Sequence, residues 1–493
     1  MQRKSKNRVS VHGPRFSAWG LALILSATAF AHVGSPDVYY EGDAGPYHLL
    51  VTVRPPAMIP GIASVEIRGG ADISSIRVAP VYITGKDPGL PPTPDVMQPV
   101  PGDPQSFTGN VWLMASGSWE VLADVNGAQG SGQLAVPVAA FARRTLPMQR
   151  ALGALLFGLM LFLSVGIVAI VGAATREGLL DPGIAATPAN RRWGRLAMVV
   201  AGLAVFGLLA LGNSWWNLDA ADLKHTMLYQ PPPLDVSLSN GNHLVLKMGD
   251  SFWHEYRKNS WSMDLVPDHG HLMHLFLLRV PEMDRFYHLH PEAAGSGRFA
   301  IDLPSVEAGH YKIFADVVRA SGFPDTMVAD MDLPNISGRP LSGDDSTAVA
   351  SAFSAAPTEV SALPDGGRMV WERAAAPGAV GKPGWFRFRV EDSAGKPVTD
   401  LEPYMGMAGH AVFVRSDESV FAHIHPAGSV PMAALAILNK NSDAGMSGMH
   451  HDSGLPAEIS FPYGFPQAGD YRLFVQVKRA GKVETGVFDT HIQ

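Results

Sequence analysis

The sequence predicts a mainly β protein, with three immunoglobulin-like β-sandwich domains and a two-helix transmembrane hairpin. Three segments share a glycine, an aromatic residue and then alternating apolar positions: GSWEVLADV (117–125), GHYKIFADV (309–317) and GDYRLFVQV (469–477). This pattern is typical of a turn that leads into a half-buried strand. The 51 glycines and 39 prolines agree with many turns between short strands. We expect sandwiches, each of roughly 100 residues, at 32–142, 228–336 and 358–493.

Two uncharged apolar runs separate the first predicted sandwich from the second. The runs, 151–174 and 196–218, are each long enough to cross a hydrocarbon core of ~30 Å, and we expect transmembrane helices at 148–174 and 196–218. The loop between them, 175–195, contains Arg176, Arg191, Arg192 and Arg195. Positive loops favour the cytoplasmic side. No acidic residue, lysine or histidine lies in either run, so we expect an anchor rather than a transport path.

The first 31 residues are predicted to be a signal peptide. Basic residues precede the apolar run AWGLALILSATAF, and AFA at 29–31 fits a cleavage site with small residues. Cleavage would leave His32 at the mature N-terminus, where its amine and imidazole can chelate a metal. The soluble domains are therefore expected on the periplasmic side of a bacterial inner (cytoplasmic) membrane.

Composition excludes several classes of site. The chain has no cysteine, which excludes disulfides, thiolate zinc sites, thiol nucleophiles and blue-copper centres with a cysteine ligand. A formal net charge of −7 provides no basic surface for nucleic acid. The segment 337–357 is rich in Ser, Ala, Gly and Asp, and it is predicted to be a linker between the last two sandwiches.

The last two predicted sandwiches contain a repeat that includes most of the histidines. DLVPDHGHLMHLFLLR (264–279) aligns without a gap with DLEPYMGMAGHAVFVR (400–415). His274 corresponds to His410, whereas two histidines of the first copy correspond to methionines of the second. These pairs are His269 with Met405 and His271 with Met407. FYHLHP and FAHIHP then continue the repeat, with His288 and His290 in the first copy and His423 and His425 in the second.

The repeated positions predict a metal site. If each copy forms a hairpin, His274 faces His290 and His410 faces His425, at Cβ separations of ~4.5–5.5 Å. A lone H-x-H is weak evidence, because a strand histidine is more often an ordinary core or surface residue, but here five positions match in two copies. The segment AGMSGMHHDSG adds Met446, Met449, His450 and His451. His48 and His225 are expected to be structural.

The exchange of His for Met favours copper over zinc. Imidazole suits Cu(II), and the soft thioether suits Cu(I). The middle domain, with five histidines, is therefore expected to hold Cu(II) or zinc. The last domain, with Met405 and Met407, is expected to hold Cu(I) relatively better.

Several segments resemble a family of bacterial membrane proteins built from YtkA-like or FixH-like β-sandwiches. They are DHGHLMHLFLLR, FYHLHPE, GHAVFVRSDESVFAHIHP, FPYGFPQAGDYRLFVQVKRAGKVETGVFD and HVGSPDVYYEGDAGPY. FixH-type relatives are linked to copper-oxidase assembly, and the start at His32 is similar to that of CopC-type periplasmic copper binders. The first domain lacks the Asp-x-His pair of the CopC pattern. The resemblance implies a periplasmic copper acceptor or an oxidase-assembly protein as partner.

Three functions are compatible with these observations. The favoured one is a membrane-anchored periplasmic protein that binds copper, and buffers it or delivers it to a partner. The second is a copper-dependent enzyme, for which no catalytic residue is predicted: Glu292 follows one H-x-H pair, but no acidic residue takes this place after Pro426. The third is a metal-free structural or adhesion module.

Overall fold

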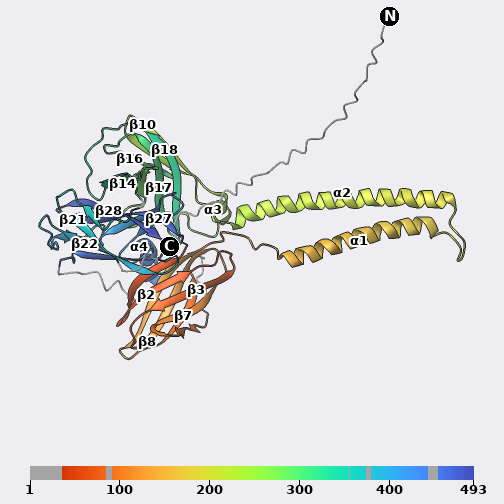
Figure 1. Cartoon of the computed structure of the whole chain (residues 1–493), viewed down its shortest axis with the longest axis horizontal. Helices are drawn as coiled ribbons and strands as arrows, with labels where there is room; N and C mark the ends of the chain where they lie inside the picture. Colours follow the sequence, from red (N-terminus) through yellow and green to blue (C-terminus); the bar gives the residue numbers. More distant parts are fainter. Residues whose placement is uncertain (1–35, 85–91, 355, 374–378, 442–453) are drawn as a thin grey trace, which may run out of the picture. The chain divides into compact units, whose positions relative to one another are not determined.

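The computed structural model describes residues 36–84, 92–354, 356–373, 379–441 and 454–493. Within these ranges the protein is mostly β, with several antiparallel sheets and two long apolar helices (Figure 1). The predicted signal peptide lies outside the described residues, and so do the candidate ligands His32, Met446, Met449, His450 and His451.

The first region consists of two sheets that share one core. One sheet contains β1 (Val38–Ala44), β2 (Tyr47–Arg54), β3 (Gly61–Arg68), β7 (Asp103–Leu113) and β6 (Gln98–Val100). The other contains β5 (Asp95–Val96), β4 (Ile73–Tyr82), β8 (Gly117–Gly127) and β9 (Gly130–Ala140). Alternate residues of both sheets, such as Val65 and Val121, meet in this core. The alternating apolar pattern of the sequence therefore corresponds to inward-facing side chains.

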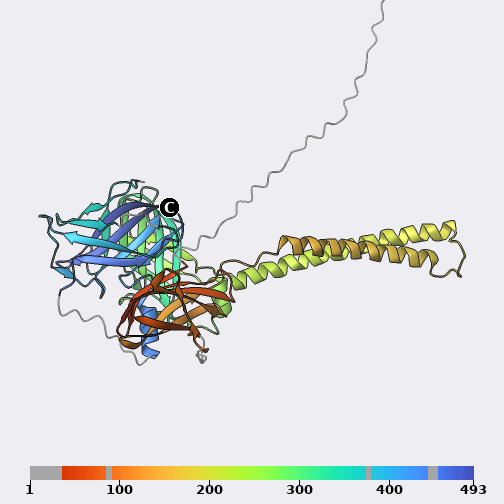
Figure 2. The ribbon, with the colours of Figure 1, turned by 60° about the horizontal axis from the view of Figure 1, so that its bottom comes forward.

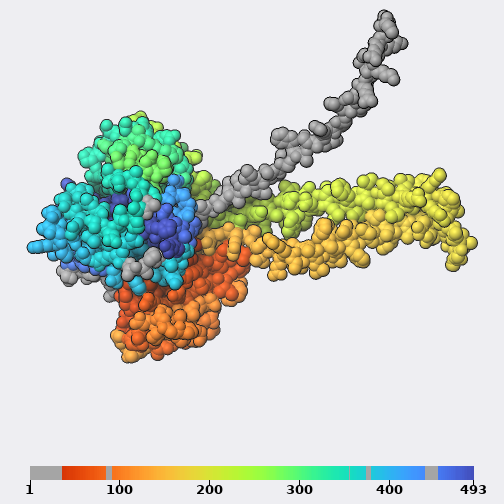
Figure 3. Space-filling model, viewed as in Figure 1, coloured from red at the N-terminus to blue at the C-terminus, as the bar shows by residue number. Residues whose placement is uncertain are grey.

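Helices α1 (Arg150–Glu177) and α2 (Pro188–Met227) follow this region and lie side by side (Figure 2). Many of their apolar side chains are exposed, and Phe162 and Phe206 are 72% and 71% exposed. The two helices are the gold to yellow-green part of Figure 3. Both helices are long and apolar enough to cross a membrane. α2 is longer at both ends than the predicted span, because hydropathy detects the apolar centre of a helix and not its ends. It begins after Thr187, whose hydroxyl accepts from the Asn190 amide.

The second region also contains two sheets with a common core. One sheet contains β10 (Leu234–Ser239), β11 (His243–Met248), β16 (Arg298–Asp302) and β15 (Glu292–Ala293). The other contains β12 (Leu265–Val266), β17 (Gly309–Arg319), β13 (His274–Arg279), β14 (Arg285–Leu289) and β19 (Ser346–Val349), with β18 (Pro324–Leu333) paired to β17. The short helix α3 (Phe252–Arg257) precedes β12.

The third region repeats this arrangement around its own core. Its first sheet contains β20 (Val360–Ala362), β21 (Arg368–Glu372), β22 (Gly384–Glu391) and β26 (Glu458–Tyr463). Its second contains β23 (Leu401–Glu402), β27 (Gly469–Arg479), β24 (His410–Arg415) and β25 (Phe421–Ile424), with β28 (Lys482–Ile492) paired to β27. The helix α4 (Met432–Asn441) follows β25. The strand order β23-β27-β24-β25 repeats β12-β17-β13-β14, so the sequence repeat is also a repeat of topology.

The segment 337–357, predicted to be a linker, contains a strand. β19 pairs with β14, and Ser346 lies opposite His288. The strand carries little sequence signal, because only four residues, STAV, form it within a run of small and polar residues. This strand covers one side of the histidine-bearing hairpin.

An aromatic layer joins the second region to the third. Phe286 stacks on Phe474 with ring centroids 4.1 Å apart, and Phe314 stacks on Phe421 at the same distance. Phe286 and Phe421 occupy equivalent positions of the repeat, and so do Phe314 and Phe474. The two contacts are therefore related by a pseudo-two-fold axis, as in the isologous interface of a symmetric dimer.

A buried ion pair lies in the second region, close to the end of α2. Arg319 Nε donates to Asp325 Oδ2 at 2.6 Å, the Tyr229 hydroxyl donates to Oδ1 at 2.8 Å, and His254 Nε2 lies 3.1 Å from both oxygens. Burial raises the pKa of the Asp325 carboxyl, but the hydrogen bonds and charges of His254 and Arg319 outweigh this effect and lower the pKa. The carboxylate is therefore ionised in the folded protein.

Replacing Asp325 with asparagine should lower the free energy of unfolding by about 1–3 kcal/mol near neutral pH. The reason is that Arg319 would lose its charged partner while remaining buried. Because folding lowers the pKa of Asp325, its contribution is present above the unfolded pKa of about 3.9 and is lost as the pH falls below it. Urea unfolding at pH 7 and at acidic pH should therefore show a difference that shrinks in acid. Asp235 is exposed, so Asp235→Asn should leave the free energy of unfolding unchanged at both pH values. If both variants lower that free energy equally, the expectation is wrong.

Candidate metal centre

The two hairpins place their histidines as the sequence predicts. In β13 and β14, Leu275 pairs with Leu289, so the register continues to His274 opposite His290, whose ring centroids are 5.0 Å apart. The β24–β25 hairpin has the same register and the same 5.0 Å separation of its two rings, those of His410 and His425. Leu289 points into the core of its own region, so the flanking histidines share the opposite face.

Two tight turns bring the repeats together. His269 and Met405 occupy equivalent positions in these turns, with φ angles of 52° and 51°, and a glycine with positive φ follows each. A non-glycine residue in this conformation costs roughly 1–3 kcal/mol, and such strain is found at functional sites. His269 Nδ1 lies 2.8 Å from the carbonyl oxygen of Met405, in the opposite repeat. The turn thus directs this histidine across the interface.

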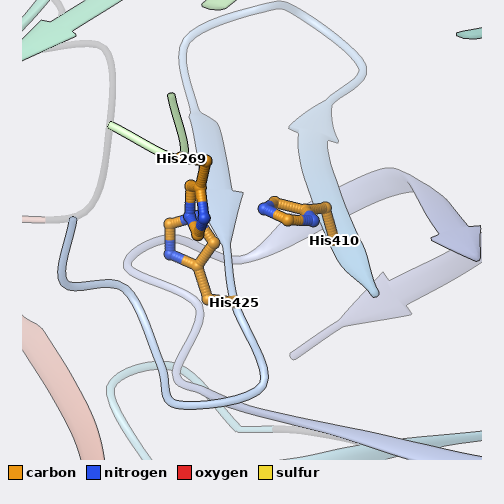
Figure 4. Close-up of side chains that lie close together, drawn as sticks. All are labelled: His269, His410 and His425. Carbon is orange, nitrogen blue, oxygen red and sulfur yellow. The ribbon is translucent and has the colours of Figure 1, made fainter. Parts of the chain in front are cut away.

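Six imidazoles form two groups of three. His269 lies with His410 and His425, and these three rings point toward one another (Figure 4). The second group comprises His274, His288 and His290. Within each group the candidate nitrogen atoms all lie within 4.8 Å of one another, a separation that one metal ion can bridge. The first group takes ligands from both repeats.

Hydrogen bonds hold two of the three rings of the first group in place. His269 Nδ1 donates to the Met405 carbonyl, and His425 Nδ1 donates to the Val430 carbonyl at 3.2 Å. In these tautomers each Nε2 carries a lone pair, and within the described residues neither Nε2 has a hydrogen-bond partner. Both nitrogens of His410 are also buried without a partner. His269 and His425 thus have the arrangement of metal-ligating histidines, in which one nitrogen is held by an outer partner and the other is free to bind.

The second group is held in the same way. His288 Nδ1 lies 2.9 Å from Gln476 Oε1, which comes from the opposite repeat, and His290 Nδ1 lies 3.0 Å from Asp345 Oδ1. His274 Nε2 lies 3.2 Å from the Asp268 carbonyl, which leaves Nδ1 as the free atom. That Nδ1 faces His288 Nε2 at a distance of 3.1 Å.

Burial keeps these imidazoles neutral. It lowers the pKa of each ring, and repulsion between neighbouring rings lowers it further; this applies to His269, His274, His288, His290, His410 and His425. A neutral imidazole is the form that binds metal. A buried polar atom without a partner costs about 1–3 kcal/mol, and a metal ion would satisfy several of these atoms at once.

The remaining predicted residues lie around the two groups or away from them. His271 stacks on His290 with centroids 4.0 Å apart, and its Nε2 lies 3.4 Å from Asp344. His423 lies between the groups, with its ring 4.7 Å from that of His425 and 5.3 Å from that of His274. Met407 is buried, and Met405 is half-buried. Away from the centre, His48 lies between Glu41 and Asp43 on an exposed surface, and His225 is exposed.

The expected division between an imidazole site in the middle domain and a His/Met site in the last domain does not match the structure. His269 joins the histidines of the last domain, because the turn that carries it crosses the interface. The outer partners Gln476, Val430 and Asp345 were not predicted from the sequence either. Asp345 lies within the supposed linker, and Gln476 belongs to a strand of the opposite repeat. Val430 contributes only its backbone carbonyl, five residues after His425, which no side-chain pattern indicates.

Comparison with known proteins leaves the function open. Residues 362–493 match the model of a family described as a domain of unknown function (DUF8832). No curated protein matches the chain.

Several solved structures are similar to parts of the chain. A tetra-tandem repeat from the extending region of a large adhesion protein is 7% identical, with 88% of this chain and 71% of that chain covered and a TM-score of 0.16. Dimeric latent PorU from Porphyromonas gingivalis is 9% identical, with 93% and 34% covered and a TM-score of 0.15. MtrC from Shewanella baltica OS185 is 11% identical, with 59% and 71% covered and a TM-score of 0.15. Scores this low carry no argument, so the function has to be argued from the site.

Proposed function

We propose that the protein is a membrane-anchored periplasmic copper-binding protein, which buffers copper or passes it to a partner. In this proposal the three pairs of sheets are immunoglobulin-like sandwiches, and α1 and α2 anchor them in a bacterial inner membrane. The observation that carries the proposal is the convergence of two three-histidine groups at the interface of the repeats. Among the described residues, buried ring nitrogens of His269, His290, His410 and His425 lack partners, while outer hydrogen bonds hold every ring except that of His410.

The choice of copper rests on the ligand types. Neutral imidazole also suits zinc, iron and nickel, so three histidines alone do not select a metal. Met405 and Met407 occupy the positions of His269 and His271 in the repeat, and the ligand type that replaces imidazole there is a thioether. Copper is the ion that both ligand types bind, as Cu(II) and Cu(I). Zinc is the competitor that a binding experiment should include.

A periplasmic acceptor of copper is the partner that this function requires. The resemblance to FixH-type domains supports an oxidase-assembly protein or a similar copper acceptor. A copper-dependent enzyme is the second candidate, because three protein ligands leave a position open for a substrate. Product formation in the presence of an oxidant would support the enzyme over the carrier.

Two copper ions per chain is the expected result of a titration of the full-length protein in detergent. Each three-histidine group would bind one ion, and zinc should compete at both. Elemental analysis after gel filtration measures the stoichiometry, and a variant with His410 and His274 both replaced by alanine should lose both ions. If the wild-type chain binds no copper above the level of that double variant, the protein is not a copper carrier.

A further inference from the structure

A cavity of about 170 Å³ adjoins several of the histidines. Asp268, His271, His274 and Asp316 line it from the second region. The third region contributes His423 and His425, and the first region contributes Asp37, Pro137 and Val138. The cavity therefore lies where all three regions meet, and it touches a member of each three-histidine group.

The β14 side and the β25 side of the histidine groups differ, because the pseudo-two-fold symmetry of the repeats is not complete. β19 pairs with the outer edge of β14, whereas β25 is the last strand of its sheet among the described residues. On the β14 side, His288 is 0% exposed and contacts Gln476, which is also bonded to Ser346 of β19. The repeat-equivalent pair on the β25 side is His423 with Asp316, and both residues line the cavity. On the side of the cavity, the carboxylate of Asp316 thus takes the place that the amide of Gln476 has on the β14 side.

Asp316 and His423 have free ligand atoms. His423 Nδ1 lies 3.5 Å from Asp316 Oδ2. The His423 side chain is 8% exposed, and the Asp316 side chain is 19% exposed. Within the described residues, His423 Nε2 and Asp316 Oδ1 are buried and have no hydrogen-bond partner. Other carboxylates of the cavity are engaged: Asp325 pairs with Arg319, and Asp268 Oδ1 accepts from the Ala433 amide at 2.6 Å.

We propose that this cavity is the entry route for the copper ion, and that Asp316 and His423 are the first protein ligands it meets. The proposal rests on the copper-binding function proposed above. A carboxylate in a cleft with apolar walls attracts a cation more strongly than it does in open water. The His423 ring lies between His425 and His274, so an ion held there can pass to either group by exchange of one ligand at a time.

The rate of copper uptake tests this route separately from the final affinity. The metal-free full-length protein in detergent is mixed with Cu(II) in a stopped-flow instrument, and the absorbance of the copper–imidazole complex is followed. Asp316→Asn should lower the uptake rate constant about tenfold or more, while the number of ions bound at saturation stays the same. Asp235→Asn removes the same charge from an exposed position of the same region and should not slow uptake.

A second variant narrows the cavity without changing any charge. Thr326 lines the cavity from β18, and Thr326→Leu places an apolar side chain there. It should also slow uptake and leave the stoichiometry unchanged. Uptake at the wild-type rate in both variants would overturn the route. Loss of a bound ion at saturation in Asp316→Asn would also overturn it, because Asp316 would then be a ligand of the final site. Failure of the wild-type protein to bind copper is a different result, which refutes the function itself.

Discussion

Replacing His269 with alanine should weaken copper binding at the first three-histidine group by about 100-fold or more. Loss of an outer hydrogen-bond partner of a ligand already lowers metal affinity by about 10–100-fold, and loss of the ligand itself should lower it at least as much. His269 supplies one of the three imidazoles of this group, and within the described residues the other two, His410 and His425, belong to the opposite repeat. The second group should keep its affinity within about threefold, because its three histidines are unchanged. One tight ion should therefore remain per chain.

A competition titration against a chelator of known copper affinity measures both sites at pH 7. His310→Ala is the matched control, because this histidine of the same region is exposed and its Nδ1 lies 2.8 Å from Asp332. The control should bind two ions with wild-type affinity. Equal behaviour of the two variants would show that His269 is no ligand. Loss of both ions from His269→Ala would show that the groups are not separate sites.

The geometry within each repeat was predictable from sequence, because it follows from strand periodicity. The alignment of DLVPDHGHLMH with DLEPYMGMAGH and the turn that follows give the facing pair His274 and His290 directly. Alternation also indicates that His288 in β14 and His290, directly after β14, lie on the same face. These inferences need only the register of one hairpin, which its turn determines.

The contact between the repeats was not predictable in the same way. HLFLLR and HAVFVR are apolar at all four positions between the histidine and the final arginine, which indicates a strand buried on both faces. That signal could have shown that the histidine-bearing face is covered, but it does not identify the opposite repeat as the part of the chain that covers it. The crossing of His269 depends on packing between residues far apart in the chain, such as Phe286 on Phe474. Asp345, which orients His290, was hidden in a segment with the composition of a linker.

Replacing Phe474 with alanine should lower the free energy of unfolding by about 3–5 kcal/mol, the usual cost of a buried Phe→Ala change. Phe474 is 0% exposed and stacks on Phe286 of the other repeat. The change removes part of the surface that holds the repeats together, so copper binding at the first group should also weaken. The reason is that His269 reaches this group only when the two repeats are in contact.

Phe488→Ala separates packing within one region from packing between the repeats. Phe488 is also 0% exposed, but it belongs to the core of the third region alone. It should cost a similar free energy of unfolding, measured by urea denaturation of the metal-free protein, and leave the affinity of the first group unchanged. Because a ligand that binds only the folded state stabilises it by RT ln(1 + [L]/Kd), copper should restore less stability to Phe474→Ala than to Phe488→Ala. Equal stabilisation of both variants by copper would mean that the interface between the repeats does not position the first group.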